Sequence, residues 1–163
     1  MTVDIQPLRE ANDLDWCART MASNEPWVTL GRDLDACRTV LASPAKERYV
    51  ITADGRRAGV LILDMNAAFA GYIQSICLTA EARNRGIGSR AIAWAEDRIF
   101  RDSPNVFICV SSFNTDAQRL YARLGYETVG VLTRFVVDEH DEFLLRKTRG
   151  SWQAFRAGLT VRS

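Results

Sequence analysis

Apolar residues recur along this chain with the two periods that distinguish strands from helices. Alternation at every second position predicts a half-buried strand, whereas recurrence at three- and four-residue intervals predicts a helix with one apolar face. In the first third, these patterns and the breaker-rich segment between them predict an edge strand, a helix, a loop and a second helix. The edge strand is expected at 2–8, and the first helix from an N-cap at Asn12 or Asp13 to about Met21. The loop is expected at 23–31 and the second helix at about 32–41.

A hairpin and a third strand come next. Asp54-Gly55 is a dipeptide that favours a tight turn between two strands, and β-rich runs lie on both sides of it. The strands of this meander are expected at 48–53, 58–64 and 71–78. A helix over about 87–100 follows, and its buried side is expected to carry Ala91, Ile92, Ala95 and Ile99.

Residues 105–111 contain an uninterrupted apolar run, which is typical of a central strand covered on both faces. Together with the preceding strand and helix, this run favours a parallel strand pair with a right-handed crossover. The remaining pattern predicts a helix with Gly125 as its C-cap and then two strands joined by a polar turn. These elements are expected at about 115–124, 127–137 and 142–149, with the turn at 138–141.

The resulting order, β-α-α-β-β-β-α-β-α-β-β, predicts an α/β fold with one mixed sheet and helices on both faces. No internal repeat or linker interrupts the chain, so we expect a single domain over residues 1–163. Residues 150–163 form a tail in which Trp152, Phe155 and Leu159 recur at helical spacing. We expect this tail to pack on its own domain or on a partner subunit.

The amino-acid composition limits the cellular environment and the kinds of partner expected for this protein. The 163 residues are 47% hydrophobic and carry a net charge of +1, which suits a globular domain but not a general nucleic-acid binder. Four cysteines without a C-x-x-C pair and one histidine give no zinc-ligand pattern, so no metal is expected. Cys77 and Cys109 are expected to pack as small hydrophobes, and His140 to lie in a solvated turn. The absence of a secretory signal and of a membrane-length apolar run predicts a cytoplasmic protein without disulfides or a membrane partner.

The clearest candidate chemistry lies in residues 82–90, here called the glycine stretch, where a predicted strand leads into a predicted helix. Gly86 and Gly88 allow the backbone to turn sharply and approach a ligand. The first N–H groups of a helix have no intrahelical partner and attract anions. Ala91 stands where a dinucleotide fingerprint needs its third glycine, and no P-loop sequence occurs. Alone, this stretch predicts either an anion cradle or a tight turn with solvated arginines.

Two motifs at matching distances carry a resemblance to a known family. Residues 83–88, Arg-Asn-Arg-Gly-Ile-Gly, fit [QR]-x-x-G-x-[GA]. About 25 residues later, 114–121 fit N-x-x-A-x-x-L-Y and lead into Arg-Leu-Gly-Tyr at 123–126. With the element order, they resemble the GCN5-related N-acetyltransferase (GNAT) superfamily over almost the whole chain. The resemblance implies the GNAT fold and direct transfer of an acetyl group from acetyl-CoA to a primary amine.

The resemblance also implies where acetyl-CoA binds. In such proteins the N–H groups of the glycine stretch hold the pyrophosphate, and the pantetheine arm lies along the strand before it. That strand and the next one splay apart, with the thioester in the gap. The residues at these positions are Ile76, Leu78, Arg83, Arg85, Gly86, Gly88, Ser89 and Asn114. A strand N–H, most naturally that of Leu78, would polarise the thioester carbonyl.

Tyr121 matches the family's tyrosine near the thioester sulfur. A tyrosine with a pKa of ~10 stays protonated at neutral pH and can donate a proton to a thiolate, whose pKa is ~8.5. A core tyrosine on an apolar helix face is the alternative interpretation. Many family members carry a Glu where this chain has Gln74, and Gln cannot act as a base. Gln74 can orient the amine or a relaying water, while Glu25, Glu81 and a water chain are alternatives for the base.

The acceptor side is the least defined. The loop over 26–32 often borders the acceptor pocket in the family, so Trp27 and Arg32 are candidate substrate contacts, as is Tyr72 beside Gln74. A loop anchored by a buried Trp is an equally good interpretation. The acceptor is expected to be a small molecule or a terminal amine, and a homodimer is left open. A non-catalytic acyl-CoA sensor or interaction module is the alternative function.

Overall fold

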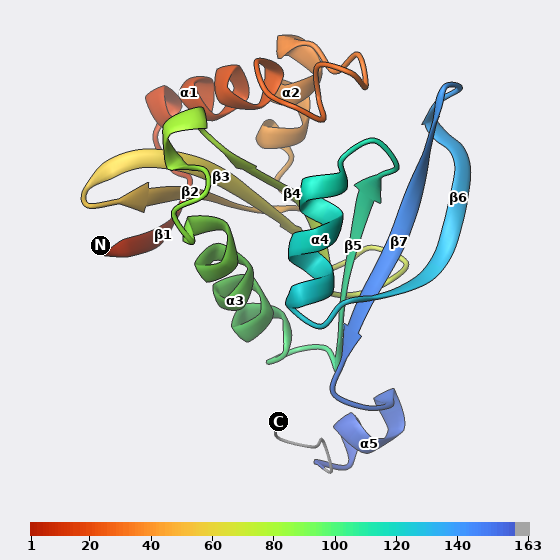
Figure 1. Cartoon of the computed structure of the whole chain (residues 1–163). Helices are drawn as coiled ribbons and strands as arrows, with labels where there is room; N and C mark the ends of the chain where they lie inside the picture. Colours follow the sequence, from red (N-terminus) through yellow and green to blue (C-terminus); the bar gives the residue numbers. More distant parts are fainter. Residues whose placement is uncertain (159–163) are drawn as a thin grey trace. The chain divides into compact units, whose positions relative to one another are not determined.

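The computed structural model of this protein describes residues 1–158 (Figure 1). Its elements are β1 (Val3–Pro7), α1 (Ala11–Ala22), α2 (Leu34–Ala42), β2 (Glu47–Ala53), β3 (Arg56–Asp64), β4 (Tyr72–Leu78), the 3₁₀ turn η1 (Ala80–Ala82), α3 (Ile87–Ile99), β5 (Asn105–Ser111), α4 (Thr115–Arg123), β6 (Glu127–Val137), β7 (His140–Thr148) and α5 (Trp152–Arg156). The strands form a seven-stranded mixed sheet in the order β1-β2-β3-β4-β5-β7-β6. The α/β fold class and the order of elements predicted from the sequence are confirmed.

The chain divides into two compact units. Unit 1 comprises Met1–Asp64 and Gln74–Trp94, and unit 2 comprises Met65–Ile73 and Ala95–Ser163. Strand β4 and helix α3 each begin in one unit and continue in the other. The single domain over residues 1–163 stays a prediction. None of the helices within residues 1–158 combines the length and apolar character needed to cross a bilayer.

In unit 1, β1, β2 and β3 are antiparallel, and β1 is the edge strand that its Pro predicted. Asp54 and Gly55 turn the β2–β3 hairpin with φ values of 49° and 75°, as this dipeptide predicts. Helices α1 and α2 cover one face of these strands through a core of buried side chains. Its members are Leu8, Cys17, Ala18, Met21, Cys37, Leu41, Val50, Val60, Ile62 and Cys77. On the other face, Trp94 of α3 packs against Tyr49 of β2 with ring centroids 4.7 Å apart.

The predicted N-cap of the first helix is wrong. Helix α1 begins at Ala11 with Glu10 as its N-cap, and Glu10 makes no side-chain capping bond. Asp13 instead lies in the first turn and forms an ion pair with Arg57 of β3 at 2.5 Å. Helix α2 follows the local rule, because the Asp33 carboxylate accepts a hydrogen bond from the Ala36 N–H at 2.9 Å.

In unit 2, β4 and β5 pair in parallel, with Tyr72 opposite Phe107 and Ile73 opposite Ile108. This pairing confirms the predicted parallel pair. On its other side, β5 pairs with β7 in an antiparallel register, and β7 pairs with β6. Strand β7 begins at His140, two residues earlier than predicted, because Val137 pairs with His140 across a shorter turn.

The prediction of a solvated His140 is therefore wrong: the side chain is half-buried, with its ring centroid 4.6 Å from that of Phe113. In the tail, the described part forms the five-residue helix α5, which has no buried residue. The rings of Trp152 and Phe155 contact each other with centroids 5.7 Å apart. Leu159, the third apolar residue of the predicted pattern, lies outside the described residues.

Candidate active site

The predicted site residues occur in both units. Unit 1 contains most of the proposed cofactor contacts and two acceptor candidates: Trp27, Arg32, Gln74, Ile76, Leu78, Arg83, Arg85, Gly86, Gly88 and Ser89. Unit 2 contains Tyr72, Asn114 and Tyr121. No cluster of three or more His, Cys, Asp or Glu side chains that could hold a metal ion occurs within residues 1–158.

The glycine stretch links η1 to α3. Asn84 and Gly86 have φ values of 57° and 76°, so the backbone passes twice through the left-handed region that favours glycine. The Arg90 N–H donates to the Gly86 carbonyl oxygen at 3.2 Å, and this bond begins the helix. The N–H groups of residues 87–89 therefore have no partner within the helix. Such a group of backbone donors at the positive end of a helix is suited to an anion.

The arginines of this stretch differ in what they contact. The Arg83 guanidinium donates to the side-chain oxygen of Asn24, in the loop after α1. Arg90 donates to the backbone carbonyl of Met1 at 2.9 Å. Arg85 is exposed. All three arginines are exposed, and Arg83 and Arg90 brace the stretch against the N-terminal region.

The part of β4 that belongs to unit 1 carries Gln74, Ile76 and Leu78. It runs so close to β3 that a Cβ added at Gly59 would collide with the Cys77 carbonyl oxygen. The Oε1 atom of Gln74 is buried and has no hydrogen-bond partner among the described residues. Because buried polar side-chain atoms in native proteins are nearly always hydrogen-bonded, this oxygen indicates a donor supplied by a ligand or by water.

In unit 2, the second sequence motif forms helix α4 and its cap. The side-chain oxygen of Asn114 accepts a hydrogen bond from the Ala117 N–H at 3.3 Å, so Asn114 is the N-cap. The Gln118 side-chain amide donates to the carbonyls of Ser111 and Ser112, both at 3.0 Å. These bonds tie the start of α4 to the end of β5.

The end of α4 explains why the motif continues into Leu-Gly-Tyr. Gly125 has a φ of 88°, the Tyr126 N–H donates to the Tyr121 carbonyl at 3.0 Å, and the Gly125 N–H donates to the Ala122 carbonyl at 3.1 Å. This pair of bonds is the Schellman motif. It brings the rings of Tyr121 and Tyr126 into an edge-to-face contact with centroids 5.8 Å apart.

Tyr121 is only 6% exposed, and this burial raises the pKa of its hydroxyl above the ordinary tyrosine value. The reason is that the tyrosinate anion would lose its hydration. Tyr121 therefore remains protonated throughout the neutral range and is chemically suited to donate a proton.

The acceptor candidates lie in different surroundings. Trp27 is half-buried and packs against the core of unit 1. This packing agrees with the interpretation that Trp27 anchors the loop over 26–32. Arg32 is exposed, and its N–H donates to the Trp27 carbonyl at 2.9 Å. Tyr72 is half-buried, and burial is the main cause that raises the pKa of its hydroxyl. Their contacts with an acceptor stay predictions.

One polar group near Tyr72 was missed by the sequence reasoning. Glu142 is only 5% exposed, and the Ser111 hydroxyl donates to its Oε1 at 2.5 Å. The two residues are 31 positions apart and meet because the register of β5 and β7 places them opposite each other. Neither residue belongs to a local motif, so only knowledge of the strand pairing could have revealed this pair.

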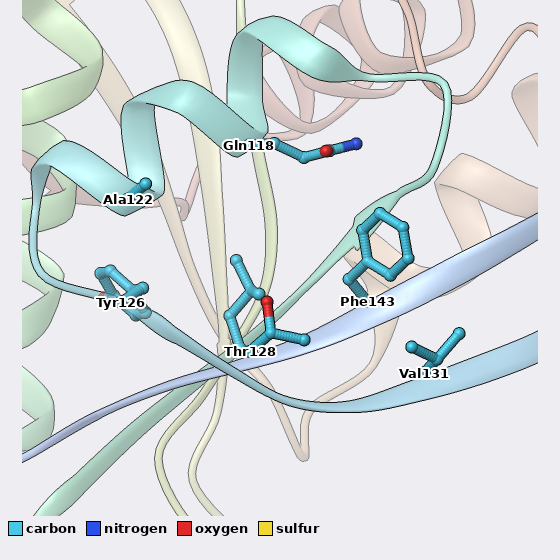
Figure 2. A pocket seen from close by; sticks show the side chains of 7 residues that line it. Gln118, Ala122, Tyr126, Thr128, Val131 and Phe143 are labelled. Atoms are coloured by element: carbon cyan, nitrogen blue, oxygen red, sulfur yellow. The ribbon is translucent and has the colours of Figure 1, made fainter.

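A groove of about 320 Å³ on unit 2 lies between α4 and the β6–β7 hairpin (Figure 2). Its lining residues are Gln118, Ala122, Tyr126, Thr128, Val131, Phe143 and Leu145. None of the predicted site residues is among them, so this groove is distinct from the candidate active site.

Comparison with known proteins establishes the family. The model of the acetyltransferase (GNAT) family matches residues 8–126, which is most of the chain. The chain belongs to the GNAT family. The resemblance of its two motifs is thus confirmed, and the match includes the glycine stretch and helix α4 of this GNAT protein.

Similar proteins are described as acetyltransferases. An uncharacterized N-acetyltransferase of Methanocaldococcus jannaschii is 30% identical over 103 residues, which is 62% of this chain and 65% of that protein. The match therefore spans just under two thirds of that relative. A structure described as a GNAT-family acetyltransferase from Desulfovibrio desulfuricans has a TM-score of 0.74 at 16% identity and covers 90% of this chain and 99% of its own.

A further structural neighbour is the spermidine N-acetyltransferase of Vibrio cholerae in complex with CoA and spermine. Its TM-score is 0.70 at 18% identity, and the match covers 90% of this chain and 95% of the neighbour. At these identities the likeness concerns the fold, which is the GNAT fold that the sequence resemblance implied.

Proposed function

We propose that this GNAT protein is an acetyltransferase that moves an acetyl group from acetyl-CoA to a primary amine by direct attack in a ternary complex. The observation that carries the proposal is the start of α3, where the N–H groups of residues 87–89 lack intrahelical partners behind the left-handed Gly86. A Cβ added at Gly86 would meet no atom of the described residues within 4 Å, so the backbone there leaves room for a pyrophosphate. The buried Oε1 of Gln74, which has no hydrogen-bond partner within residues 1–158, also fits a bound molecule.

The proposed binding contacts follow from these features. The donors of Arg85, Gly86, Gly88 and Ser89 would hold the pyrophosphate, and the exposed guanidinium of Arg85 adds positive charge. The neighbouring Arg83 would act by bracing the stretch through Asn24.

The pantetheine arm would run along the main chain of Ile76 and Leu78. The side-chain oxygen of Asn114 caps α4, so we propose that its side-chain amide nitrogen contacts the pantetheine arm.

The proposed chemistry needs a neutral amine, a polarised carbonyl and a protonated leaving group. The thioester supplies an acetyl group activated for attack, and the Leu78 N–H would polarise its carbonyl oxygen. The nitrogen forms a bond to the acetyl carbon while the carbon–sulfur bond breaks. Tyr121, kept protonated by its burial, would give its hydroxyl proton to the leaving thiolate. Gln74 would orient the amine or a relaying water.

We further propose that the protein acts in the cytoplasm, on a small-molecule or terminal amine. The test is the release of CoA thiol from acetyl-CoA with a panel of amines, set against hydrolysis without amine. The panel includes polyamines, aralkylamines and peptides with a free N-terminus. We expect at least one amine to raise thiol release well above background. Tight acetyl-CoA binding without turnover on any amine would instead support the non-catalytic acyl-CoA sensor.

A further inference from the structure

Unit 2 contains a row of buried and half-buried polar side chains that the proposed mechanism has not used. In the antiparallel register of β5 and β7, Ser111 lies opposite Glu142. Side chains alternate between the faces of a strand, so Cys109 and Ser111 share one face of β5. Tyr72, which lies opposite Phe107 on β4, is on this face too. Three neighbouring strands thus contribute polar side chains to the same face.

Glu142 is the charged member of this row. It is 5% exposed, and the neutral hydroxyl of Ser111, itself 2% exposed, donates to its Oε1 at 2.5 Å. No Lys or Arg forms an ion pair with Glu142 in the part of the chain that the structure describes. A buried carboxylate without a cationic partner is costly, because one hydrogen bond does not replace its hydration.

Within residues 1–158, the titratable groups that act on Glu142 include no Lys or Arg, and Arg146 lies further along the same face of β7, opposite Phe107. The groups that do act on it are Tyr72 from β4, Cys109 from β5 and His140 from β7 itself. Burial raises the pKa of Glu142, while the Ser111 hydrogen bond and the nearby His140 act in the opposite direction. The carboxylate is therefore a better proton acceptor than an exposed Glu.

Aromatic rings border both ends of the row. Phe69 packs against Phe107 with ring centroids 5.0 Å apart, and Phe113 packs against His140 at the other end. An anionic group between aromatic rings is complementary to an organic ammonium ion, which gains from both the charge and the ring faces.

We propose that Glu142 binds the ammonium group of the acceptor and takes its proton before acetyl transfer. This inference rests on the proposed function and supplies the base that Gln74 cannot be. The acceptor class that fits is an alkyl or aralkyl primary amine without a carboxylate next to its nitrogen, because a second anion would face Glu142.

The proton balance is complete. The ammonium gives one proton to the Glu142 carboxylate and becomes a neutral amine. Its nitrogen bonds to the acetyl carbon, the carbon–sulfur bond breaks, and the thiolate receives the Tyr121 proton. The second nitrogen proton returns to the tyrosinate, and the Glu142 proton leaves to solvent. The net products are the amide, CoA thiol and one proton.

The test compares wild type, Glu142→Gln and the exposed control Glu139→Gln by their pH profiles of kcat/KM with phenethylamine. We expect wild type and the control to share an acid limb in the carboxyl range. Glu142→Gln should lose this limb and fall ~10²-fold or more, the scale of a positioned base. Ser111→Ala should shift the limb to higher pH, because it removes the donor that stabilises the carboxylate. If the acid limb of the pH profile is the same in Glu142→Gln and Ser111→Ala as in wild type, the inference is overturned.

Equilibrium binding separates this inference from the proposed function. Titration calorimetry with phenethylamine should show affinity at least about tenfold weaker for Glu142→Gln than for wild type, the scale of one charge-assisted hydrogen bond. Phenylalanine, the matched amine with a carboxylate, should bind more weakly than phenethylamine to wild type. Equal phenethylamine affinity of wild type and variant would overturn the inference. A wild type that binds phenethylamine but never releases thiol would overturn the proposed function and the proton transfer assigned to Glu142.

Discussion

At the scale of the residue, the role of some side chains can be predicted from the residues next to them in the sequence. The role of others depends on a residue far away in the chain. Tyr121 belongs to a motif that can be recognised along the chain, and its burial raises the pKa of its hydroxyl, so it stays protonated well above neutral pH. Glu142 stands in an ordinary strand, and only its partner Ser111 makes it notable.

Replacing Tyr121 by Phe should lower turnover ~10²-fold or more while the dissociation constant for acetyl-CoA is unchanged, because only the proton donor is removed. Tyr126→Phe is the matched control, since Tyr126 packs edge-to-face against the same ring and is equally 6% exposed. Steady-state kinetics and calorimetry measure both quantities. Equal turnover of Tyr121→Phe and wild type would remove Tyr121 from the mechanism.

The raised pKa of Glu142 also predicts how stability varies with pH. The folded protein holds this proton more tightly than the unfolded chain, whose Glu has a pKa of about 4.3. The contribution of Glu142 to the free energy of unfolding is therefore full below that value and declines as pH rises through the folded pKa. The melting temperature of Glu142→Gln relative to wild type should increase from pH 4 towards neutrality. A constant difference would contradict the raised pKa.

At the scale of the element, glycines mark where the backbone must turn or approach another strand. Gly86 and Gly55 have nearly the same φ, 76° and 75°, and a Cβ at either would meet no atom of residues 1–158 within 4 Å. Gly59 differs, because its Cβ would collide with the backbone of β4.

Gly86→Ala and Gly55→Ala should each lower the free energy of unfolding by about 1 kcal/mol, since both force a side chain into the left-handed region. Only Gly86→Ala should also weaken acetyl-CoA binding, by tenfold or more, because its Cβ would crowd the pyrophosphate. Denaturant unfolding and calorimetry give the two quantities. Equal acetyl-CoA affinities in the two variants would contradict the cradle.

Gly59→Ala should destabilise the protein by about 1–3 kcal/mol, because the Cys77 carbonyl and the Leu78 side chain would have to move. Gly130→Ala on β6 is the control, as a Cβ there meets nothing within 4 Å and Gly130 has no positive φ. The melting temperatures of the two variants, measured by thermal unfolding, test this prediction. Equal melting temperatures would show that β3 and β4 can separate at little cost.

At the scale of the whole molecule, the seven strands follow the order β1-β2-β3-β4-β5-β7-β6, and two compact units share β4 and α3. The sequence predicted the type and order of these elements, the parallel pair and the central place of β5. These features are predictable because alternation of apolar residues indicates a strand and helical periodicity indicates a helix. A βαβ unit, in turn, nearly always has a right-handed crossover.

The sequence by itself determined features that depend on neighbouring residues. Asp54-Gly55 specified a tight turn, Gly125 ended α4, and Gly86 opened α3, because each conformation is decided by local φ preference and by bonds to residues a few positions away. The two motifs around these glycines were enough to indicate the GNAT family.

Only the tertiary structure decided features that join distant parts of the chain. Asp13 pairs with Arg57 instead of capping α1, Arg83 holds Asn24, and Ser111 meets Glu142 across two strands. The first two pairs depend on how a helix or loop packs against a distant segment. The Ser111–Glu142 pair depends on strand register, and a one-residue shift would place its side chains on opposite faces. For this reason the glycine stretch could be found from the sequence, whereas the carboxylate proposed to serve the acceptor amine could not.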